Sequence, residues 1–454
     1  MKRVFVILIL SLVGLGLSAR DSKFTRHGSG PKYWIAYEWC FDNDKALPEQ
    51  RWKNNIDWIA EVLKPYGYDM ICNDGWIEGA QSVNENGYIT KYNSGWLHDF
   101  RYWNDYIESK GLKVGVYYNP MWLTRKAFFD NCLVDGTTDI HASDIVGEHS
   151  FNGDLFWVDV NKDGAEEWIK GYVRYFKNLG VKYLRIDFLE NYERNYGTAS
   201  YQTALRWISE EAGDELFLSL VMPNCFNHGE VEIQYGDMIR VSNDCFKGGW
   251  DFVSQRNRGR RRSYWPQYDN LFDGLIAFSD ITNPGQLIAD GDFMRLASLQ
   301  GIEEMKFEFS LMVMAGSALA VADEYDTATK DVIKVYTNRE LLALNEEGFV
   351  GNPYSYDICA KSSSCWIGRT VDGDVILGLF NREDSDLPFN VDFQNVLGLE
   401  SDYVENVRDM WEHKDLGSFE GSYSVVLKPH TCRILRIHPG ERKSVGLFTS
   451  CTRM

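Results

Sequence analysis

Short apolar, β-branched runs alternate with amphipathic helical stretches over most of the chain, up to about residue 345. Each run has the length of one strand, and each stretch between runs has the length of one helix. Eight such units in succession predict a (β/α)8 barrel. The strands are expected at Tyr33–Tyr37, Tyr68–Asn73, Lys113–Tyr118, Tyr183–Phe188, Leu216–Met222, Met238–Ser242, Gln286–Ala289 and Ala318–Ala322. The helices between them are expected to include Gln50–Lys64, Trp96–Lys110, Ala165–Leu179, Thr203–Ala212 and Phe307–Met314.

The pattern changes beyond about Gly348, where short strand-like segments follow one another without helical stretches. Turns such as Asp372-Gly373-Asp374 separate them, which is typical of a small antiparallel β domain. We therefore predict a barrel over residues 20–348 and a C-terminal antiparallel β-sandwich over residues 349–454. Its strands are expected at Trp366–Arg369, Val375–Asn381, Tyr403–Trp411, Tyr423–Leu427 and Thr431–Ile437.

The N-terminus has the pattern of a secretory signal. Met1-Lys2-Arg3 precedes the 14-residue apolar run Val4–Leu17, and Ser18-Ala19 provides small residues for cleavage. The apolar run is too short for a transmembrane helix. We predict a signal peptide over residues 1–19, export to the periplasm or the medium, and no membrane association after cleavage.

The charge balance bears on the choice of partner. Lys and Arg number 47 against 66 Asp and Glu, a net charge of −19, which argues against nucleic acid or an anionic membrane surface. Such a chain can bind a neutral, polyhydroxylated ligand. Aromatic residues make up 14% of the chain, and their ring faces suit the C–H faces of sugars, although a large aromatic core would use them equally well.

No cofactor or metal is expected from the sequence. No spacing resembles a zinc site, and no glycine-rich loop predicts binding of a phosphate-bearing cofactor. The segment Asp159–Gly164 resembles the start of an EF-hand loop, but Lys170 stands where calcium binding requires a glutamate. We interpret this segment as a turn.

Nine cysteines in an exported chain permit disulfides, and the odd number leaves at least one thiol unpaired within the monomer. Spacing alone does not decide among the possible pairs. The candidates are Cys359 with Cys365, Cys40 with Cys72, and Cys225 with Cys245.

Polar or acidic side chains follow the predicted strands from the second to the eighth. A single aspartate in this position is usually a turn or helix cap, but in a barrel these strand ends meet on the face that carries the active site. Two carboxylates about 5–5.5 Å apart would supply the nucleophile and the acid/base of a retaining glycosidase, and Asp187 and Asp244 are the candidates. The strand-end residues are Asp74, Asn119, Asp187, Asn224, Asp244, Asp290, Asp292 and Asp323.

Several of these segments resemble motifs of one enzyme family. Tyr183-Leu184-Arg185-Ile186-Asp187 is similar to a Tyr-Leu-Lys-Tyr/Phe-Asp strand, and Asp244 lies four residues after Arg240, as the family's acid/base follows an arginine. Tyr33-Trp34, Asn73-Asp74-Gly75-Trp76 and Asp290-Gly291-Asp292-Phe293-Met294 also resemble family motifs. Over about residues 30–350 the chain resembles glycoside hydrolase family 27, the α-galactosidases and α-N-acetylgalactosaminidases.

The resemblance implies an exported retaining exo-α-glycosidase, most simply an α-galactosidase, whose nucleophile is Asp187 and whose acid/base is Asp244. An oligosaccharide or glycoconjugate would be its substrate. α-N-acetylgalactosaminidase and β-L-arabinopyranosidase activities stay open, as does a non-catalytic carbohydrate-binding role. The expected substrate-binding residues are Trp34, Asp74, Trp76, Arg185, Arg240 and Asp292.

Two departures from the family pattern bear on the sugar. Arg185 stands where the family usually has lysine, and Val221 stands where it has the glutamate that binds the sugar's 2-hydroxyl. A smaller apolar side chain at 221 could leave room for a 2-acetamido group or indicate a different sugar.

Overall fold

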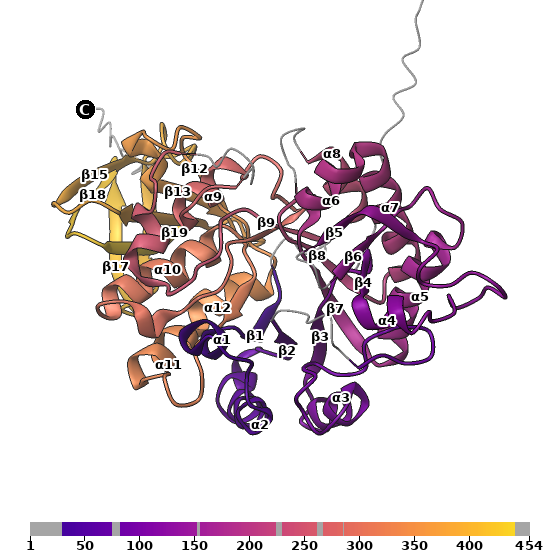
Figure 1. Ribbon diagram of the computed structural model, residues 1–454. Helices are drawn as coiled ribbons and strands as arrows, with labels where there is room; N and C mark the ends of the chain where they lie inside the picture. Colours follow the sequence, from indigo (N-terminus) through magenta and orange to yellow (C-terminus); the bar gives the residue numbers. More distant parts are fainter. Residues whose placement is uncertain are drawn as a thin grey trace, which may run out of the picture.

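The computed structural model describes residues 30–74, 82–151, 155–223, 229–260, 267–284 and 286–440. Eight parallel strands form its main sheet, in the order β10-β9-β8-β7-β3-β2-β1-β11 (Figure 1). Each of them overlaps one of the predicted strands. Their bounds are β1 (Lys32–Ala36), β2 (Met70–Asn73), β3 (Lys113–Tyr117), β7 (Val181–Ile186), β8 (Phe217–Leu220), β9 (Met238–Arg240), β10 (Ile288–Asp290) and β11 (Leu319–Val321).

The two end strands of this sheet, β10 and β11, also meet. Ala318 N donates a hydrogen bond to Ala289 O at 3.0 Å, and Met294 and Val321 form a parallel bridge. The sheet therefore closes on itself, and the predicted (β/α)8 barrel is confirmed. Its strands are almost entirely buried, because helices cover the outer face and side chains fill the interior.

The α-helices of the described residues are α1 (Glu38–Asn43), α2 (Glu49–Trp58), α3 (Phe100–Ser109), α4 (Arg125–Phe129), α5 (Ala165–Asn178), α6 (Leu189–Tyr196), α7 (Thr198–Ala212), α8 (Glu230–Tyr235), α9 (Leu271–Ala277), α10 (Ile302–Met314), α11 (Lys330–Tyr336) and α12 (Arg339–Glu346). The five helices with predicted bounds are α2, α3, α5, α7 and α10, and their ends differ from the prediction by up to six residues. Short π or 3-10 segments lie at Ile59–Leu63, Lys64–Tyr66, Asp251–Gln255, Leu296–Ser298 and Lys361–Ser364.

A small antiparallel sheet, which the sequence analysis did not predict, lies between β3 and α5. Its strands are β4 (Trp122–Thr124), β5 (Val146–Phe151) and β6 (Leu155–Val158), in the order β4-β6-β5. Trp122 of β4 packs its ring near those of Tyr117 and Phe188, which lie at the ends of β3 and β7. The insertion therefore supports the two strand ends that border the site described below.

The C-terminal part is the predicted antiparallel β domain. A six-stranded sheet has the order β12-β13-β14-β19-β16-β17, and β15 pairs with β18 in a second sheet. The strands are β12 (Asn352–Pro353), β13 (Cys365–Arg369), β14 (Val375–Asn381), β15 (Leu387–Asp392), β16 (Tyr403–Asp409), β17 (Lys414–Glu420), β18 (Ser422–Leu427) and β19 (Thr431–Pro439).

The two domains share one apolar core at helix α10. Every residue from Phe307 to Met314 in this helix is buried, and strands β14 and β19 of the β domain lie against it (Figure 1). A helix that is largely apolar and buried on all sides needs partners all round it. One side of α10 faces the barrel, and the β domain covers the other. The β-domain side chains that join the barrel core are Trp366, Ile376, Phe380, Met410 and Ile434.

Polar contacts across the same interface add to the apolar packing. The guanidinium of Arg382 is buried and lies 2.7 Å from Asp273 of α9. Trp411 Nε1 donates to Ser310 Oγ of α10 at 2.8 Å. By contrast, the ion pair between Arg258 and Glu383 is partly exposed.

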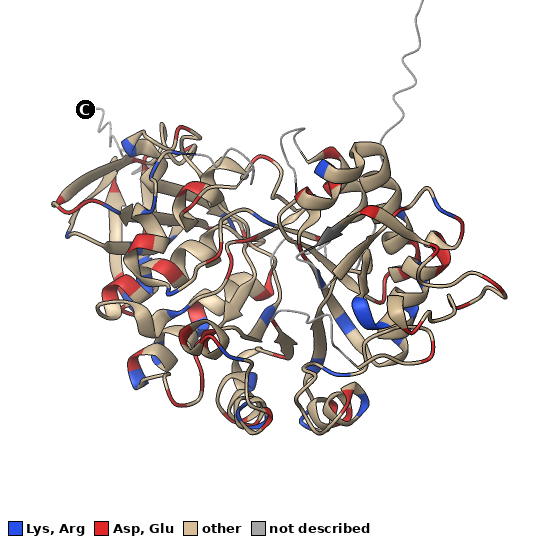
Figure 2. Ribbon diagram, in the orientation of Figure 1, with Lys and Arg blue, Asp and Glu red and all other residues tan. Residues whose placement is uncertain are grey.

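Acidic positions are spread over both domains, with basic positions between them (Figure 2). Within the described part of the chain, no helix combines the length and apolarity needed to span a bilayer. The predicted signal peptide lies outside the described residues.

Two of the three candidate disulfides are not formed. Cys359 and Cys365 are both free thiols, and so are Cys40 and Cys72. Cys245 is also free, and its candidate partner Cys225 lies outside the described residues. Burial suits most of these thiols, because a neutral S–H behaves as a small apolar group.

Candidate active site

A cavity of about 420 Å³, termed here the central cavity, opens at the C-terminal ends of the barrel strands. This volume is within the usual range for small-molecule sites. Its polar lining comes from the ends of four strands. The lining residues are Asp74, Tyr117, Arg185, Asp187, Arg240 and Asp244, with Ala36, Tyr37, Cys40, Phe41, Asp44, Phe246, Lys247 and Phe293 around them.

Asp187 follows the last residue of β7 and has both carboxylate oxygens engaged. Tyr117 donates its hydroxyl to Oδ2 at 2.8 Å, and the backbone N–H of Phe188 donates to Oδ1 at 2.6 Å. The second contact depends on the left-handed backbone of Phe188, whose φ of 61° turns the chain from β7 into α6. Such a conformation is unusual for a bulky residue and occurs mainly at functional sites. The carboxylate is thus held in one orientation.

Asp244 lies four residues beyond the end of β9 and lines the same cavity as Asp187. One of its oxygens is 2.6 Å from Arg240 Nη2, and its side chain is 29% exposed. Its backbone carbonyl accepts a hydrogen bond from Arg256 Nη1 at 2.9 Å, which fixes the loop that carries it. The Asp244 carboxylate is therefore fixed in place and still accessible to solvent.

Arg185 and Arg240 form a buried network behind this pair. Arg185 Nη1 lies 2.7 Å from Asp290, and both guanidinium groups reach Asp292 Oδ1, at 3.3 Å from Arg185 and 3.4 Å from Arg240. The other oxygen of Asp292 accepts the Cys245 N–H at 2.7 Å. The site thus holds two guanidinium groups and five carboxyl groups, those of Asp74, Asp187, Asp244, Asp290 and Asp292. This excess of carboxyl groups over cations favours the protonated form of some of them.

The pKa values follow from this crowding. Burial raises the pKa of Asp187 above its ordinary value; the charge of Asp244 adds to the rise, and Arg240 and Arg185 oppose it. Burial likewise raises the pKa of Asp74 to about 7 and that of Asp292 to about 6. A cluster of carboxyl groups in a cavity, with some ionised and some protonated near neutral pH, is suited to acid–base chemistry.

Comparison with known proteins places the chain among glycoside hydrolases. Residues 360–437 match the α-galactosidase C-terminal β-sandwich domain. The chain is 42% identical to the isomalto-dextranase of Arthrobacter globiformis, over 94% of this chain and 70% of that enzyme. The structure of the A. globiformis T6 enzyme complexed with panose superposes with a TM-score of 0.88, over 93% of this chain and 75% of that one.

More distant relatives share the fold. A family 27 β-L-arabinopyranosidase from Geobacillus stearothermophilus is 18% identical, with a TM-score of 0.75 over 94% of this chain and all of that one. α-Galactosidase 3 of Arabidopsis thaliana is 21% identical, over 74% of this chain and 65% of that protein. The 42% identity, which spans both domains, decides the family. The chain belongs to glycoside hydrolase family 27.

This result confirms the family resemblance and the glycoside hydrolase class predicted from the sequence. The structure brings five of the eight predicted site residues together at the central cavity. They are Asp74, Arg185, Asp187, Arg240 and Asp244. Trp76 lies outside the described residues.

The other two predicted substrate-binding residues are in different surroundings. Trp34 is fully buried, packs on Trp52 and donates its indole N–H to Asp323 O at 3.0 Å, so it fills the core instead of forming a wall for the sugar. Asp292 is also fully buried and does not line the cavity, because its oxygens are taken up by the two arginines and Cys245 N–H. These contacts hold the two arginines in place.

Val221 is fully buried too, and it is not among the described residues that line the central cavity. Its backbone N–H donates to Ile186 O at 2.8 Å, as part of the sheet between β7 and β8. The valine therefore does not control access to the sugar's 2-position, contrary to the interpretation from the sequence.

The sequence analysis missed Tyr117 and Asp290. Tyr117 is the last residue of β3, two positions before the predicted polar residue Asn119, so its place at a strand end was the available signal. Asp290 was recognised as a strand-end residue but not as the closest partner of Arg185. Among the described residues, no group of three or more His, Cys, Asp or Glu side chains is arranged to hold a metal ion.

Proposed function

We propose that this family 27 enzyme is a retaining glycoside hydrolase that cleaves α-1,6-linked glucose polymers of the dextran type. One observation carries the proposal: the chain is 42% identical to an isomalto-dextranase over 94% of its length, and the aligned part includes the barrel that holds Asp187 and Asp244. The α-galactosidases are more distant, at 21% identity for the Arabidopsis enzyme, and carry less weight for the choice of sugar.

The proposed reaction is a double displacement. Asp187 attacks the anomeric carbon and forms an ester bond to it, while the glycosidic C–O bond breaks and Asp244 gives its proton to the departing oxygen. Asp244, now a carboxylate, then takes a proton from water, whose oxygen attacks the same carbon and releases Asp187. The two steps return both carboxyl groups to their starting states.

The surroundings of each carboxylate support its proposed role. The hydrogen bonds from Tyr117 and the Phe188 N–H orient Asp187 for attack and stabilise its ionised form. Asp244 has one close partner, Arg240, and is 29% exposed, so that water can reach it in the second step. Arg240 also contacts Asp292 and is held in place on the far side of Asp244.

A substrate panel tests the choice of sugar. Dextran and linear isomalto-oligosaccharides are compared with nitrophenyl α-galactoside, α-N-acetylgalactosaminide and β-L-arabinopyranoside, and the anomeric form of the first product is followed by NMR. We expect hydrolysis of the α-1,6-glucans with retention of the α configuration. Turnover of the α-galactoside without turnover of dextran would overturn the proposal and favour the α-galactosidase specificity predicted from the sequence.

A variant at the nucleophile tests the mechanism. Asp187→Gly or Asp187→Ala is expected to abolish turnover, and azide should partly restore it by forming a β-glycosyl azide, because the anion fits the space that the carboxylate leaves. Full activity in either variant would refute the role of Asp187. If the wild type binds sugars but hydrolyses none of the panel, the non-catalytic carbohydrate-binding alternative replaces the enzyme.

We also propose that the enzyme is exported. The apolar segment Val4–Leu17 after Met1-Lys2-Arg3 supports this, and a polymeric substrate is available only outside the cell membrane. Fractionation of a producing cell checks the location, and N-terminal sequencing of the mature chain checks cleavage after Ala19.

A further inference from the structure

The segment that carries Asp244 leaves the central cavity and then returns to it. Residues 244–258 are termed here the acid/base arm, and the π segment Asp251–Gln255 lies within it. Short π segments are rare and occur frequently at functional sites. The guanidinium of Arg256, directly after this segment, donates to the backbone carbonyls of Asp244 at 2.9 Å and Cys245 at 3.2 Å. The later part of the arm therefore holds the residue at its start.

Arg382 of the β domain, which directly follows β14, contacts the π segment of the arm. Its Nε donates to Ser254 Oγ at 2.9 Å, and its Nη2 donates to the backbone carbonyl of the same serine. In return, Gln255 Nε2 donates to Arg382 O at 2.8 Å. Ser254 and Arg382 are both buried, and hydrogen bonds are stronger away from water. The π segment is thus fixed to the β domain by side-chain and backbone groups together.

A second contact joins the β domain to the start of the π segment. The imidazole of His430, directly before β19, stacks on the indole of Trp250, with ring centroids 4.1 Å apart and an angle of 22° between the ring planes. One ring nitrogen of His430 is 2.9 Å from Glu304 of α10, and the other is 3.0 Å from Asp384. Trp250 also packs against Phe307 of α10, with ring centroids 4.8 Å apart. The indole is therefore held by both domains.

These contacts differ from the rest of the domain interface in what they touch. The ion pair of Glu340 with His413 joins the domains at α12, and the apolar packing joins them at α10. Neither helix supplies a described residue to the lining of the central cavity. By contrast, His430 and Arg382 contact the segment that supplies Asp244. A shift of about 1 Å in a catalytic group can cost about 100-fold in rate, so contacts that fix the arm bear directly on catalysis.

The barrel also holds the two residues that follow Asp244. The Cys245 N–H donates to Asp292 at 2.7 Å, and the Phe246 carbonyl accepts a hydrogen bond from Arg295 at 2.7 Å. Loss of the β-domain contacts should therefore shift the Asp244 carboxyl group without releasing it. We expect such a change to remove a part of the acid catalysis and not the whole.

We propose that the β domain positions the acid/base of this enzyme: His430 and Arg382 hold the arm, and the arm holds Asp244 through Arg256. Neither His430 nor Arg382 is among the described residues that line the central cavity, so both are positioning residues. The inference rests on the proposed function, in which Asp244 protonates the departing oxygen. It gives the C-terminal domain a part in that step.

Two substrates with different leaving groups separate positioning of the acid from general damage to the protein. In dextran the departing group is a sugar hydroxyl, which needs the proton of Asp244, whereas the fluoride of α-glucosyl fluoride leaves as an anion without one. The value of kcat/KM reports the first chemical step, in which Asp187 forms the ester bond. We expect His430→Ala to lower kcat/KM on dextran by about tenfold, a part of the roughly 10²- to 10⁴-fold contribution of general acid–base catalysis, and to change it on the fluoride by less than about twofold.

Two control variants set the scale. Asp244→Asn should show the same difference between the two substrates, with a larger loss on dextran, because it removes the acid itself. His413→Ala removes another ion pair between the domains, the one with Glu340 at 2.7 Å, and should leave kcat/KM on both substrates within about twofold of the wild type.

The outcomes distinguish this inference from the proposed function. Equal losses on both substrates in His430→Ala, or no loss on either, would overturn the inference and leave the hydrolase function standing. Equal losses in Asp244→Asn would overturn the acid/base role of Asp244, and no turnover of either substrate by the wild type would overturn the hydrolase function itself. If His430→Ala does not fold, Gln255→Ala, which removes the bond from the arm to Arg382 O, is measured in the same way and judged by the same outcomes.

Discussion

Asp292 is the clearest test of how charge is balanced in this site. Its carboxylate is fully buried and lies between Arg185 and Arg240, so a first expectation is that removing its charge would destabilise the fold. The pKa of Asp292 leads to the opposite expectation, that removing the charge stabilises the fold. Burial raises the pKa of Asp292 to about 6 in spite of both arginines, which means that the cost of desolvating the charge exceeds the attraction.

The size of the effect follows from linkage. An aspartate has a pKa of about 3.8 in the unfolded chain and about 6 here, a difference that corresponds to about 3 kcal/mol. Between these pH values the folded protein binds more protons than the unfolded chain, so the free energy of unfolding falls as the pH rises. Above about pH 6 the whole penalty is present. Asparagine carries no charge, so the Asp292→Asn variant does not have this penalty.

Asn also suits the backbone, because residue 292 has a φ of 71°, in the left-handed region that Asn tolerates well. About 1 kcal/mol of this penalty is already present at pH 4.5, so we expect the stability of Asp292→Asn relative to the wild type to rise by about 2 kcal/mol from pH 4.5 to pH 8. Its kcat/KM should fall about tenfold or more, because the arginines lose the group that positions them.

Denaturant unfolding at the two pH values measures the change in stability. Asp214→Asn, at an exposed position, controls for the loss of one negative charge. Constant destabilisation at both pH values, or a larger loss at pH 8, would show that the arginines outweigh burial and would refute the reasoning.

Two further predictions concern Tyr117 and the domain interface. Tyr117→Phe removes a 2.8 Å hydrogen bond to Asp187, and we expect kcat/KM to fall about 10- to 100-fold with little change in thermal stability; unchanged steady-state kinetics would contradict the role assigned to the hydroxyl. Arg382→Met leaves Asp273 buried without its partner and should cost about 3–5 kcal/mol of unfolding free energy. Arg258→Met, in the partly exposed pair of the same interface, should cost at most about 1 kcal/mol, and equal losses in the two variants by denaturant unfolding would show that burial does not set the strength of these pairs.

The barrel could be predicted from the sequence because each strand is a short buried run between amphipathic helices. Helix ends were less well predicted: the third helix begins at Phe100, four residues after its expected start, because the Asp99 side chain accepts the Tyr102 N–H and caps it there. The small sheet at Trp122–Thr124 and Val146–Phe151 was missed. The first of these strands is only three residues long, and the second has no regular alternation of apolar and polar residues.

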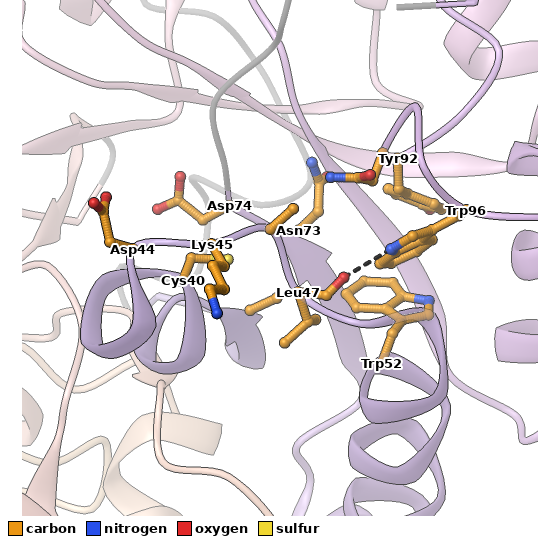
Figure 3. Close-up of a pocket in the computed structure, with 12 residues that line it drawn as sticks. Cys40, Asp44, Lys45, Leu47, Trp52, Asn73, Asp74, Tyr92 and Trp96 are labelled. Carbon is orange, nitrogen blue, oxygen red and sulfur yellow. Dashed lines mark hydrogen bonds between the residues drawn. The ribbon is translucent and has the colours of Figure 1, made fainter.

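The two catalytic candidates could be found because a strand-end aspartate in a barrel has a known position. The contacts of the neighbouring polar residues could not be predicted in the same way. Trp34 lies in β1 and Asp292 lies two residues beyond the end of β10, and both are buried. Side chains of a barrel strand face either the helices or the interior, and periodicity does not show which interior groups a ligand reaches. The cavity lined by Trp52, Asp74 and Trp96 combines α2, the end of β2 and the loop before α3, segments that only the folded chain brings together (Figure 3).

Helix α10 has a consequence for the order in which the chain folds. The helix is buried along Phe307–Met314, yet part of its cover comes from β14 and β19, which are synthesised roughly 60 to 130 residues later. Until those strands emerge, the last part of the barrel exposes a largely apolar helix to water. The barrel therefore completes its fold only after translation of the β domain, and a shortened product that ends near residue 348 would be prone to aggregation.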